Sequence, residues 1–316
     1  DLSKPYSTLA TLKHFIAYGT TEGGQNGNQS IAGQRDLLQN FFPPFKKVID
    51  AGALSIMTSY NSLDGRPSSA SRDLFKGFVV SDLYSIDGIW ETHHVAKSRQ
   101  EAGIMALQAG VDEDLGGKAF GELADAVRKG LVSESEIDVA CGRILTKKFE
   151  MGLFDHPYVD VKAAKEVGSK AHEAIALDAA RKLVTLLKNQ NHILPLRKDI
   201  RVAVIGPNAD NVYNMLGDYT SPQPDGKVKT ILTGIRSKLP EANVTYVKGC
   251  AVRDTAHCDI AAAVEAARQA DVVIVAVGGS SARDFKTSYK ATGAAEADIR
   301  SVSDMDCGEG YDRATL

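Results

Sequence analysis

The chain has 316 residues, of which 43% are hydrophobic and 24% charged, with 28 glycines and 10 prolines. This composition excludes disordered, collagen-like and coiled-coil proteins, and at roughly 150 residues per domain the length predicts two domains. Lysine and arginine number 37 against 40 acidic residues, so the formal charge of −3 gives no support for a nucleic-acid partner. The longest apolar run, residues 272–277, is far shorter than the ~20 residues of a membrane-spanning helix.

The first half of the chain alternates short apolar strands with helices. The pattern predicts strands at 9–17, 54–59 and 77–81, and helices at 34–51, 98–109 and 121–129. Such repetition is typical of a parallel α/β sheet or barrel, in which chemistry collects at the carboxyl ends of the strands. The polar residues at or near those ends are His14, Tyr60, Asn61, Ser81 and Asp82.

The segment 155–158 interrupts this pattern, and we place the domain boundary there. A long helix is expected over 163–189, with its apolar side formed by Ile175, Leu183, Leu186 and Leu187. The second half then predicts a strand at 201–205 with a turn at 206–208, a helix at 261–270, and a strand at 272–277 ending in two glycines. Because an apolar strand buried on both faces needs cover on both sides, we expect another α/β layer structure. The glycine-rich turns lack the spacing and the lysine of nucleotide-binding loops, which favours ordinary strand ends.

The cysteines show no pattern of a metal site. Cys141, Cys250, Cys258 and Cys307 include no CxxC pair and no ligand-like histidine spacing. A disulfide between Cys250 and Cys258 fits their separation, but free thiols packed as small apolar groups are the favoured interpretation. The first residues show neither the basic nor the apolar stretch of a secretory signal, so they do not reveal the compartment.

Two carboxylates carry the candidate chemistry. Asp82 directly follows the apolar strand 77–81 and precedes a loop with a second acid, Asp87. A short carboxylate at a strand end is well held for nucleophilic attack, although taken alone an aspartate there more often caps the next turn. Glu309 lies between Gly308 and Gly310, which permit close backbone approach; its alternative is an exposed glutamate in a polar loop.

Three further residues near the strand ends are candidates for binding. Lys13 and His14 supply a cation and a group that can donate or accept, which suits the clamping of hydroxyls. Their structural alternatives are a solvated lysine and a core histidine with satisfied hydrogen bonds. Tyr60, considered singly, is more often a packing residue.

Taken together, these segments resemble glycoside hydrolase family 3 over nearly the whole chain. The resemblance is carried, in order, by Ala10-Thr11-Leu12-Lys13-His14-Phe15, Met57-Thr58-Ser59-Tyr60-Asn61-Ser62, Gly77-Phe78-Val79-Val80-Ser81-Asp82, Ala109-Gly110-Val111-Asp112, Phe149-Glu150-Met151-Gly152-Leu153-Phe154, Leu186-Leu187-Lys188-Asn189, Ile205-Gly206-Pro207-Asn208-Ala209 and Glu309-Gly310-Tyr311-Asp312-Arg313. Each segment is short, but their joint order and spacing are very specific.

The resemblance implies an α/β fold. Residues 1–158 would form the C-terminal part of a (β/α)8-type barrel carrying the nucleophile, 159–190 a linker and helix, and 191–316 an incomplete α/β sandwich domain carrying the acid/base. It also implies exo-acting, retaining hydrolysis of terminal β-linked glucose or xylose in oligosaccharides or aryl glycosides. No metal or organic cofactor is expected, and no membrane partner.

Site roles also follow from the resemblance. The family pattern makes Asp82 the nucleophile and Glu309 the acid/base. Lys13 and His14 match the pair that grips sugar hydroxyls, Tyr60 matches the tyrosine beside the nucleophile, and Met57 is expected to line the same pocket.

The sequence departs from the family pattern in several places. It begins at what resembles the middle of the barrel and ends shortly after Glu309. Leu74 runs directly into Phe75 where the family usually has a helix and a Trp-Gly step, and Leu83 stands where a tryptophan often follows the nucleophile. Because half a barrel leaves open strand edges, we expect the sequence to be part of a longer protein.

Two alternatives remain at this point. An N-acetyl-β-glucosaminidase of the same family commonly uses a loop histidine as acid/base, and the match at Glu309 argues against it. A catalytically inactive carbohydrate-binding relative is disfavoured by the presence of both Asp82 and Glu309. Glucose against xylose, linkage preference and oligomeric state stay open, a homo-oligomer being compatible with the sequence. The family resemblance suggests a periplasmic or secreted location.

Overall fold

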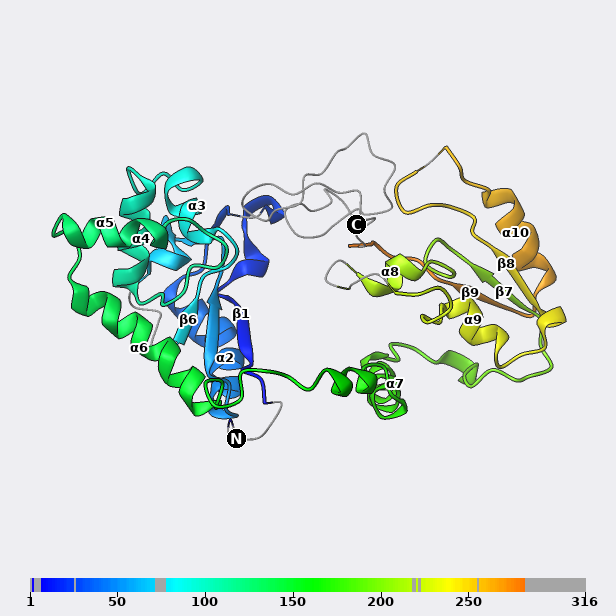
Figure 1. Cartoon of the computed structure of the whole chain (residues 1–316). Helices are drawn as coiled ribbons and strands as arrows, with labels where there is room; N and C mark the ends of the chain where they lie inside the picture. Colours follow the sequence, from blue (N-terminus) through cyan, green and yellow to red (C-terminus); the bar gives the residue numbers. More distant parts are fainter. Residues whose placement is uncertain are drawn as a thin grey trace. The chain divides into compact units, whose positions relative to one another are not determined.

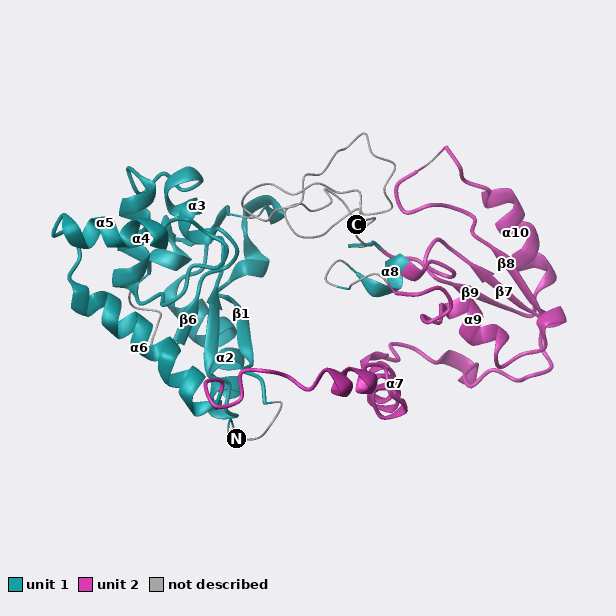
Figure 2. Ribbon diagram, viewed as in Figure 1, with its two compact units in different colours: residues 1–152, 213–221, 279–316 teal, residues 153–212, 222–278 magenta. Residues whose placement is uncertain are grey.

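The computed structural model describes residues 2, 7–25, 27–71, 78–217, 220, 223–254 and 256–281 (Figure 1). The chain forms two compact units (Figure 2). The first contains Asp1–Gly152 and two shorter stretches from later in the chain, and the second contains Leu153–Val212 and Pro222–Gly278. Within the described ranges, no helix is long and apolar enough to cross a membrane.

The first unit is built on a parallel sheet. Its strands are β1 (Thr11–Phe15), β3 (Ser55–Thr58) and β6 (Phe78–Val80), in the order β1-β3-β6. Register pairs Leu12 with Ile56 and Ile56 with Val79, and Val80 continues the sheet through a parallel bridge to Glu113. These strands confirm the three expected from the apolar runs. The described strands form an open sheet, so the α/β class is confirmed while the closed-barrel origin stays a prediction.

Helices connect and cover these strands. They are α1 (Gln34–Asp36), α2 (Phe42–Asp50), α3 (Ser85–Glu91), α4 (Arg99–Ala109), α5 (Leu123–Arg128) and α6 (Glu134–Glu150). A π-helical turn joins α1 to α2, which makes the expected helix 34–51 nearly continuous. The Ser98 hydroxyl caps α4, and Gly110 ends it at φ +102°, as local sequence predicts. The expected helices are therefore confirmed, whereas α3 and α6 were not predicted.

A small second sheet adjoins the carboxyl end of β3. It consists of β2 (Gln29–Ser30), β4 (Ser62–Leu63) and β5 (Arg66–Pro67), in the order β2-β4-β5. Asp64 and Gly65 form the β4–β5 turn with positive φ, the conformation that an Asp-Gly hairpin favours. The turn 68–70 after β5 returns the chain beneath the end of β3.

The core of the first unit lies between the parallel sheet and its helices. Its fully buried side chains include Ile16 of the chain after β1, Val79 of β6, and Ile86 and Ile89 of α3. Gly103 of α4 allows close contact, since a Cβ there would lie 2.7 Å from the Ala119 carbonyl oxygen. This packing holds β6 and α3, and with them the turn that contains Asp82.

The second unit has its own parallel sheet. The strands β7 (Val202–Ile205), β8 (Val244–Val247) and β9 (Val272–Val275) lie in the order β8-β7-β9. The helices of this unit in the described residues include α7 (Lys170–Leu183), α9 (Ile231–Arg236) and α10 (Ile260–Gln269), whereas α8 (Val212–Leu216) lies, from Tyr213 on, in a stretch that belongs to the first unit (Figure 2). The predicted strands and the helix 261–270 are confirmed, and Val202, Val204 and Leu232 form the centre of this core.

Two expectations in the second half were wrong. The expected helix 163–189 is shorter at both ends, because Val161–Glu166 form a separate 3-10 helix and α7 spans only Lys170–Leu183. Val184 is extended, in keeping with the β-branched pair Val184-Thr185. The expected apolar side is exposed at all four of its residues. The strand 272–277 is not buried on both faces: in β9, Val272 and Ile274 are half-buried and Val275 is 58% exposed, while α10 packs against β8 and β7.

The cysteines in the described part of the chain are free thiols. Cys141 and Cys258 are exposed and Cys250 is half-buried, so the expectation that they pack as buried apolar groups was wrong. Cys307 lies outside the described residues.

Candidate active site

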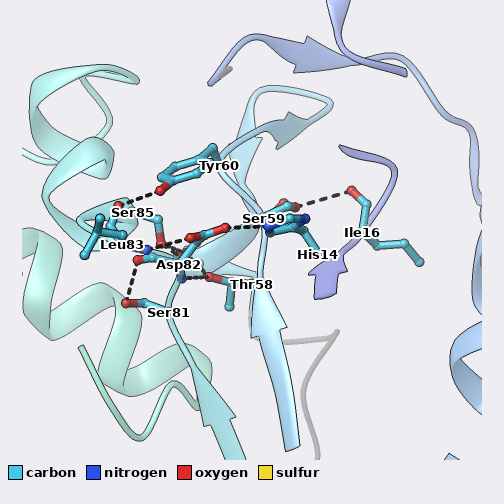
Figure 3. Close-up of polar contacts among 11 residues, drawn as sticks. His14, Ile16, Thr58, Ser59, Tyr60, Ser81, Asp82, Leu83 and Ser85 are labelled. Atoms are coloured by element: carbon cyan, nitrogen blue, oxygen red, sulfur yellow. Dashed lines mark hydrogen bonds and ion pairs between the residues drawn. The ribbon is translucent and has the colours of Figure 1, made fainter. Parts of the chain in front are cut away.

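The carboxyl ends of β1, β3 and β6 bring His14, Tyr60 and Asp82 together (Figure 3). Parallel neighbours end at the same edge of a sheet, so side chains that are 46 and 22 positions apart in sequence (60 minus 14, and 82 minus 60) become neighbours. Lys13 is exposed on β1 and Met57 is half-buried on β3. Their roles at this edge stay predictions.

The two oxygens of the Asp82 carboxylate have different surroundings. Asp82 is only 6% exposed. Its Oδ1 accepts a hydrogen bond from the Leu83 backbone N–H at 2.7 Å. Its Oδ2 lies 3.0 Å from His14 Nε2, which is within ion-pair distance but lacks hydrogen-bond geometry (Figure 3). Among the described residues, both Oδ2 and Nε2 are therefore buried without a hydrogen bond.

The backbone of Asp82 is held on both sides. Its N–H points to the Thr58 hydroxyl oxygen at 3.4 Å, and its carbonyl accepts from the Ser81 hydroxyl at 2.9 Å and from Ser85 N–H at 3.0 Å. Tyr84, with φ +59°, turns the chain from the strand end into α3. The carboxylate is thus mounted on a tight strand-to-helix turn.

Aromatic rings flank this turn. The His14 and Tyr18 ring centroids are 4.7 Å apart, and those of Tyr18 and Tyr60 are 6.2 Å apart. The Tyr60 hydroxyl donates to the Leu83 carbonyl at 2.8 Å, which ties the ring to the residue after Asp82. Sequence reasoning missed Tyr18, because it lies in an irregular turn with no periodic signal.

Tyr60 is also fixed through its backbone by His93. His93 Nε2 lies 2.8 Å from the Tyr60 carbonyl oxygen. Burial lowers the pKa of His93, although this hydrogen bond acts in the opposite direction. The neutral ring must then carry its proton on Nε2 to donate to the carbonyl. His93 was not singled out from sequence either, since it follows α3 in a short polar stretch.

Asp87, the second acid after the strand, is not part of this edge. It lies in α3 rather than in a loop, and its Oδ1 accepts from Arg99 Nε at 2.6 Å. Its Oδ2 accepts from the Lys118 backbone N–H at 3.1 Å. Asp87 is therefore a buried link between α3, α4 and the chain before α5.

Asn61 and Asp112 are also structural in the contacts they make. The Asn61 amide donates to the Ile16 carbonyl at 3.2 Å and to the Ser30 hydroxyl at 3.1 Å. Asp112 accepts from Val79 N–H at 2.9 Å and from Arg143 at 2.7 Å, while burial raises its pKa. Asn61 therefore connects the chain after β1 to β2, and Asp112 connects β6 to α6.

Glu309, the expected acid/base, lies outside the described residues. Its pairing with Asp82 stays a prediction. In the described ranges, no three His, Cys, Asp or Glu side chains are grouped so as to hold a metal ion.

Comparison with known proteins identifies the family. Residues 4–147 match the glycosyl hydrolase family 3 N terminal domain, and residues 184–316 match its C-terminal domain. A periplasmic beta-glucosidase of Salmonella typhimurium is 31% identical over 91% of this chain and 45% of its own length. A beta-xylosidase of Formosa agariphila is 33% identical over 98% of this chain and 43% of its own length.

Solved structures agree with this assignment. The beta-glucosidase from Listeria innocua in complex with glucose matches with a TM-score of 0.77 and 28% identity, over 87% of this chain and 39% of that chain. The chain thus spans less than half the length of these relatives. The matches to both family domains, in the expected order, show that this chain belongs to glycosyl hydrolase family 3.

Proposed function

We propose that the protein is a retaining, exo-acting β-glycosidase that removes terminal β-linked glucose or xylose from oligosaccharides. The observation that carries this proposal is the buried pair of Asp82 Oδ2 and His14 Nε2, which face each other without a hydrogen bond. The two atoms lie within ion-pair distance, but neither makes a hydrogen bond to another described residue, so both can hydrogen-bond to a polar ligand. Relatives named beta-glucosidase and beta-xylosidase support the substrate class.

In the proposed reaction, Asp82 Oδ2 attacks the anomeric carbon while Glu309 protonates the departing oxygen. The Leu83 N–H at Oδ1 keeps the carboxylate in one orientation during the attack. Water then cleaves the glycosyl ester, with Glu309 now accepting the proton of the water. The two displacements retain the anomeric configuration, and this scheme uses no metal or organic cofactor.

Binding of the terminal sugar falls to the residues around Asp82. His14 can exchange a hydrogen bond with a sugar hydroxyl through its buried Nε2, and Lys13 adds a cation from the same strand. Tyr60 and Met57 would line the pocket. A periplasmic or secreted location belongs to the proposal, since one relative is named periplasmic.

Three aryl substrates test the substrate class. Release of nitrophenol from the β-glucoside or β-xyloside is expected, together with a β-configured first product by NMR. Faster cleavage of the N-acetyl-β-glucosaminide would favour the glucosaminidase alternative. Release from none of them would support an inactive carbohydrate-binding relative.

A mechanism-based label tests the nucleophile. A 2-deoxy-2-fluoro-β-glycoside with a good leaving group is expected to add one fluorosugar to the chain, on the peptide that contains Asp82. Labelling of another carboxylate in an active protein would overturn the assignment of Asp82.

Glu309→Ala tests the acid/base. Substrates with a good leaving group need little proton donation, so their slow hydrolysis is expected to persist while methyl β-glycosides are no longer cleaved. Steady-state rates on the two substrate classes measure this difference. Equal loss on both would remove Glu309 from the acid role.

A further inference from the structure

A ring of three buried hydroxyls lies beneath Asp82. Thr58 comes from β3, Ser69 from the turn after β5, and Ser85 from the first turn of α3. Thr58 Oγ1 lies 2.6 Å from Ser69 Oγ and 3.3 Å from Ser85 Oγ, and the two serine oxygens are 2.9 Å apart. All three residues are at most 5% exposed.

The number of hydroxyl protons in this ring matches the number of its hydrogen bonds. Each hydroxyl has one proton to donate and two lone pairs, so three hydroxyls supply one proton for each of the three contacts. The Asp82 N–H, 3.4 Å from Thr58 Oγ1, then occupies the second lone pair of that oxygen. If any one hydroxyl is removed, each of the other two loses one of its two buried hydrogen bonds. The three hydroxyls therefore depend on one another.

The ring contacts Asp82 directly at its N–H, and the Ser85 residue of the ring also binds the Asp82 carbonyl through its backbone. The Asp82 N–H faces Thr58, and the Asp82 carbonyl accepts from the backbone N–H of Ser85, whose hydroxyl belongs to the ring, and from the Ser81 hydroxyl outside the ring (Figure 3). Fixing the groups on both sides of a Cα sets the direction of its Cα–Cβ bond. The direction of the carboxylate therefore depends on β3, the 68–70 turn and α3 together.

We infer that the hydroxyl ring of Thr58, Ser69 and Ser85 positions the Asp82 carboxylate for attack. The ring residues do not touch the reacting atoms, and their role rests on the proposed function of Asp82 as nucleophile. Small displacements of a reacting group cost large factors in rate, up to about 100-fold for 1 Å. Loss of the ring should thus lower kcat while leaving the binding groups in place.

The neighbouring Ser71 provides a matched control. It is buried like the ring serines and follows the same turn, but its hydroxyl donates to the Pro67 carbonyl at 3.0 Å. Ser71→Ala removes one buried hydroxyl of the same kind without touching the ring. It therefore reports the general cost of such a change.

The test compares Thr58→Val, Thr58→Ser, Ser69→Ala and Ser71→Ala in the full chain. For Thr58→Val and Ser69→Ala, kcat on an aryl β-glucoside is expected to fall about 10- to 100-fold, with KM changed far less. Thr58→Ser restores the hydroxyl and is expected to recover most of kcat, and Ser71→Ala should behave like the wild type. If Thr58→Val does not fold, Ser69→Ala and its comparison with Ser71→Ala decide the matter.

A second readout does not depend on activity. The Asp82 amide is expected to exchange its hydrogen with solvent about tenfold faster in Thr58→Val than in Thr58→Ser, as measured by NMR. Wild-type exchange and wild-type kcat in Thr58→Val would overturn the inference, as would an equal loss of kcat in Ser71→Ala. If the wild-type chain cleaves no glycoside, the proposed function is wrong. The role of the ring is then judged by amide exchange alone, and equal exchange at Asp82 in Thr58→Val and Thr58→Ser would reject it.

Discussion

The two carboxylate oxygens of Asp82 make different contacts. Oδ1 is held by the backbone N–H of Leu83, while Oδ2 faces His14 without a hydrogen bond. The first contact gives a fixed direction, and the second leaves a lone pair for a ligand. A carboxylate with both oxygens fully hydrogen-bonded, such as Asp87, is a weaker nucleophile because its lone pairs are already engaged.

Asp82→Asn is expected to lower turnover by about 10⁴-fold or more, since an amide is a poor nucleophile and no glycosyl ester forms. Aryl β-glycoside hydrolysis measures this loss. Asp50→Asn is the matched control, because Asp50 is exposed at the end of α2 and pairs only with Lys46 in the contacts described for it. A variant at Asp82 that retains a tenth of wild-type activity would contradict the assignment.

At the scale of elements, β7 and β9 show that similar composition leads to different burial. Val202 and Val204 of β7 are fully buried, whereas Val273 and Val275 of β9 are exposed on one face. β7 lies between the other two strands and is covered by α10, which also contacts β8. The position in the sheet, not the apolar run itself, decides how much of each strand is buried.

The turn after β7 requires glycine. Gly206 has φ +117°, and a Cβ there would lie 2.2 Å from the Ala276 carbonyl oxygen after β9. Gly206→Ala is therefore expected to destabilise the second unit by about 2 kcal/mol or more, through backbone strain and overpacking. Gly234→Ala in α9 is the control, where a Cβ meets nothing within 4 Å and helix propensity gains about 0.5–1 kcal/mol. Urea unfolding of both variants measures the difference, and equal stabilities would contradict it.

An ion pair between Arg201 and Asp271 joins the residues that directly precede β7 and β9, and it makes stability depend on pH. Hydrogen bonds from the Arg201 side chain and backbone lower the pKa of Asp271 from 3.8 to about 2. The unfolded chain binds the proton more readily, so this stabilisation is present above pH 3.8 and is lost as the pH falls toward about 2.

Asp271→Asn is accordingly expected to lower the free energy of unfolding at neutral pH. Its difference from the wild type is expected to disappear over the acidic window in which the pH falls from 3.8 to about 2. Unfolding free energy against pH measures the effect. Asp199→Asn serves as the control, since Asp199 pairs with Arg197 and has no role in joining the two strands in the contacts described for it. A constant difference between Asp271→Asn and the wild type across the window would contradict the linkage.

At the scale of the whole molecule, the chain has separate hydrophobic cores in its two units. Ile86 belongs to the core of the first unit and Leu232 to that of the second, and both are at most 1% exposed. Each core draws on strands and helices of its own unit. Loss of packing in one unit should therefore leave the other intact.

Ile86→Ala and Leu232→Ala are each expected to destabilise their own unit by about 2–5 kcal/mol. Amide exchange at Val79 reports the first unit and exchange at Val204 reports the second. Each substitution is expected to accelerate exchange only at the reporter of its own unit. Acceleration of both reporters by either variant would show that the two units unfold as one.

Local sequence patterns predicted many of the strands and helices described above. The apolar runs predicted β1, β3, β6 and β7, and the spacing of apolar residues predicted the helix 98–109 that contains α4, because such patterns involve neighbours in the chain. The Val-Val-Ser-Asp segment likewise singled out Asp82 and its place at a strand end.

Contacts between segments far apart in the chain could not be predicted from local sequence patterns. The meeting of Thr58, Ser69 and Ser85, the pairing of Asp87 with Arg99 and the exposed face of β9 depend on register and crossovers. No periodicity encodes them, since a hydroxyl or a carboxylate looks the same in sequence whether its partner is close or absent. The sequence by itself determined which carboxylate stands at a strand end, because that depends on neighbours in the chain; the packing of three separate elements decided the surroundings of that carboxylate.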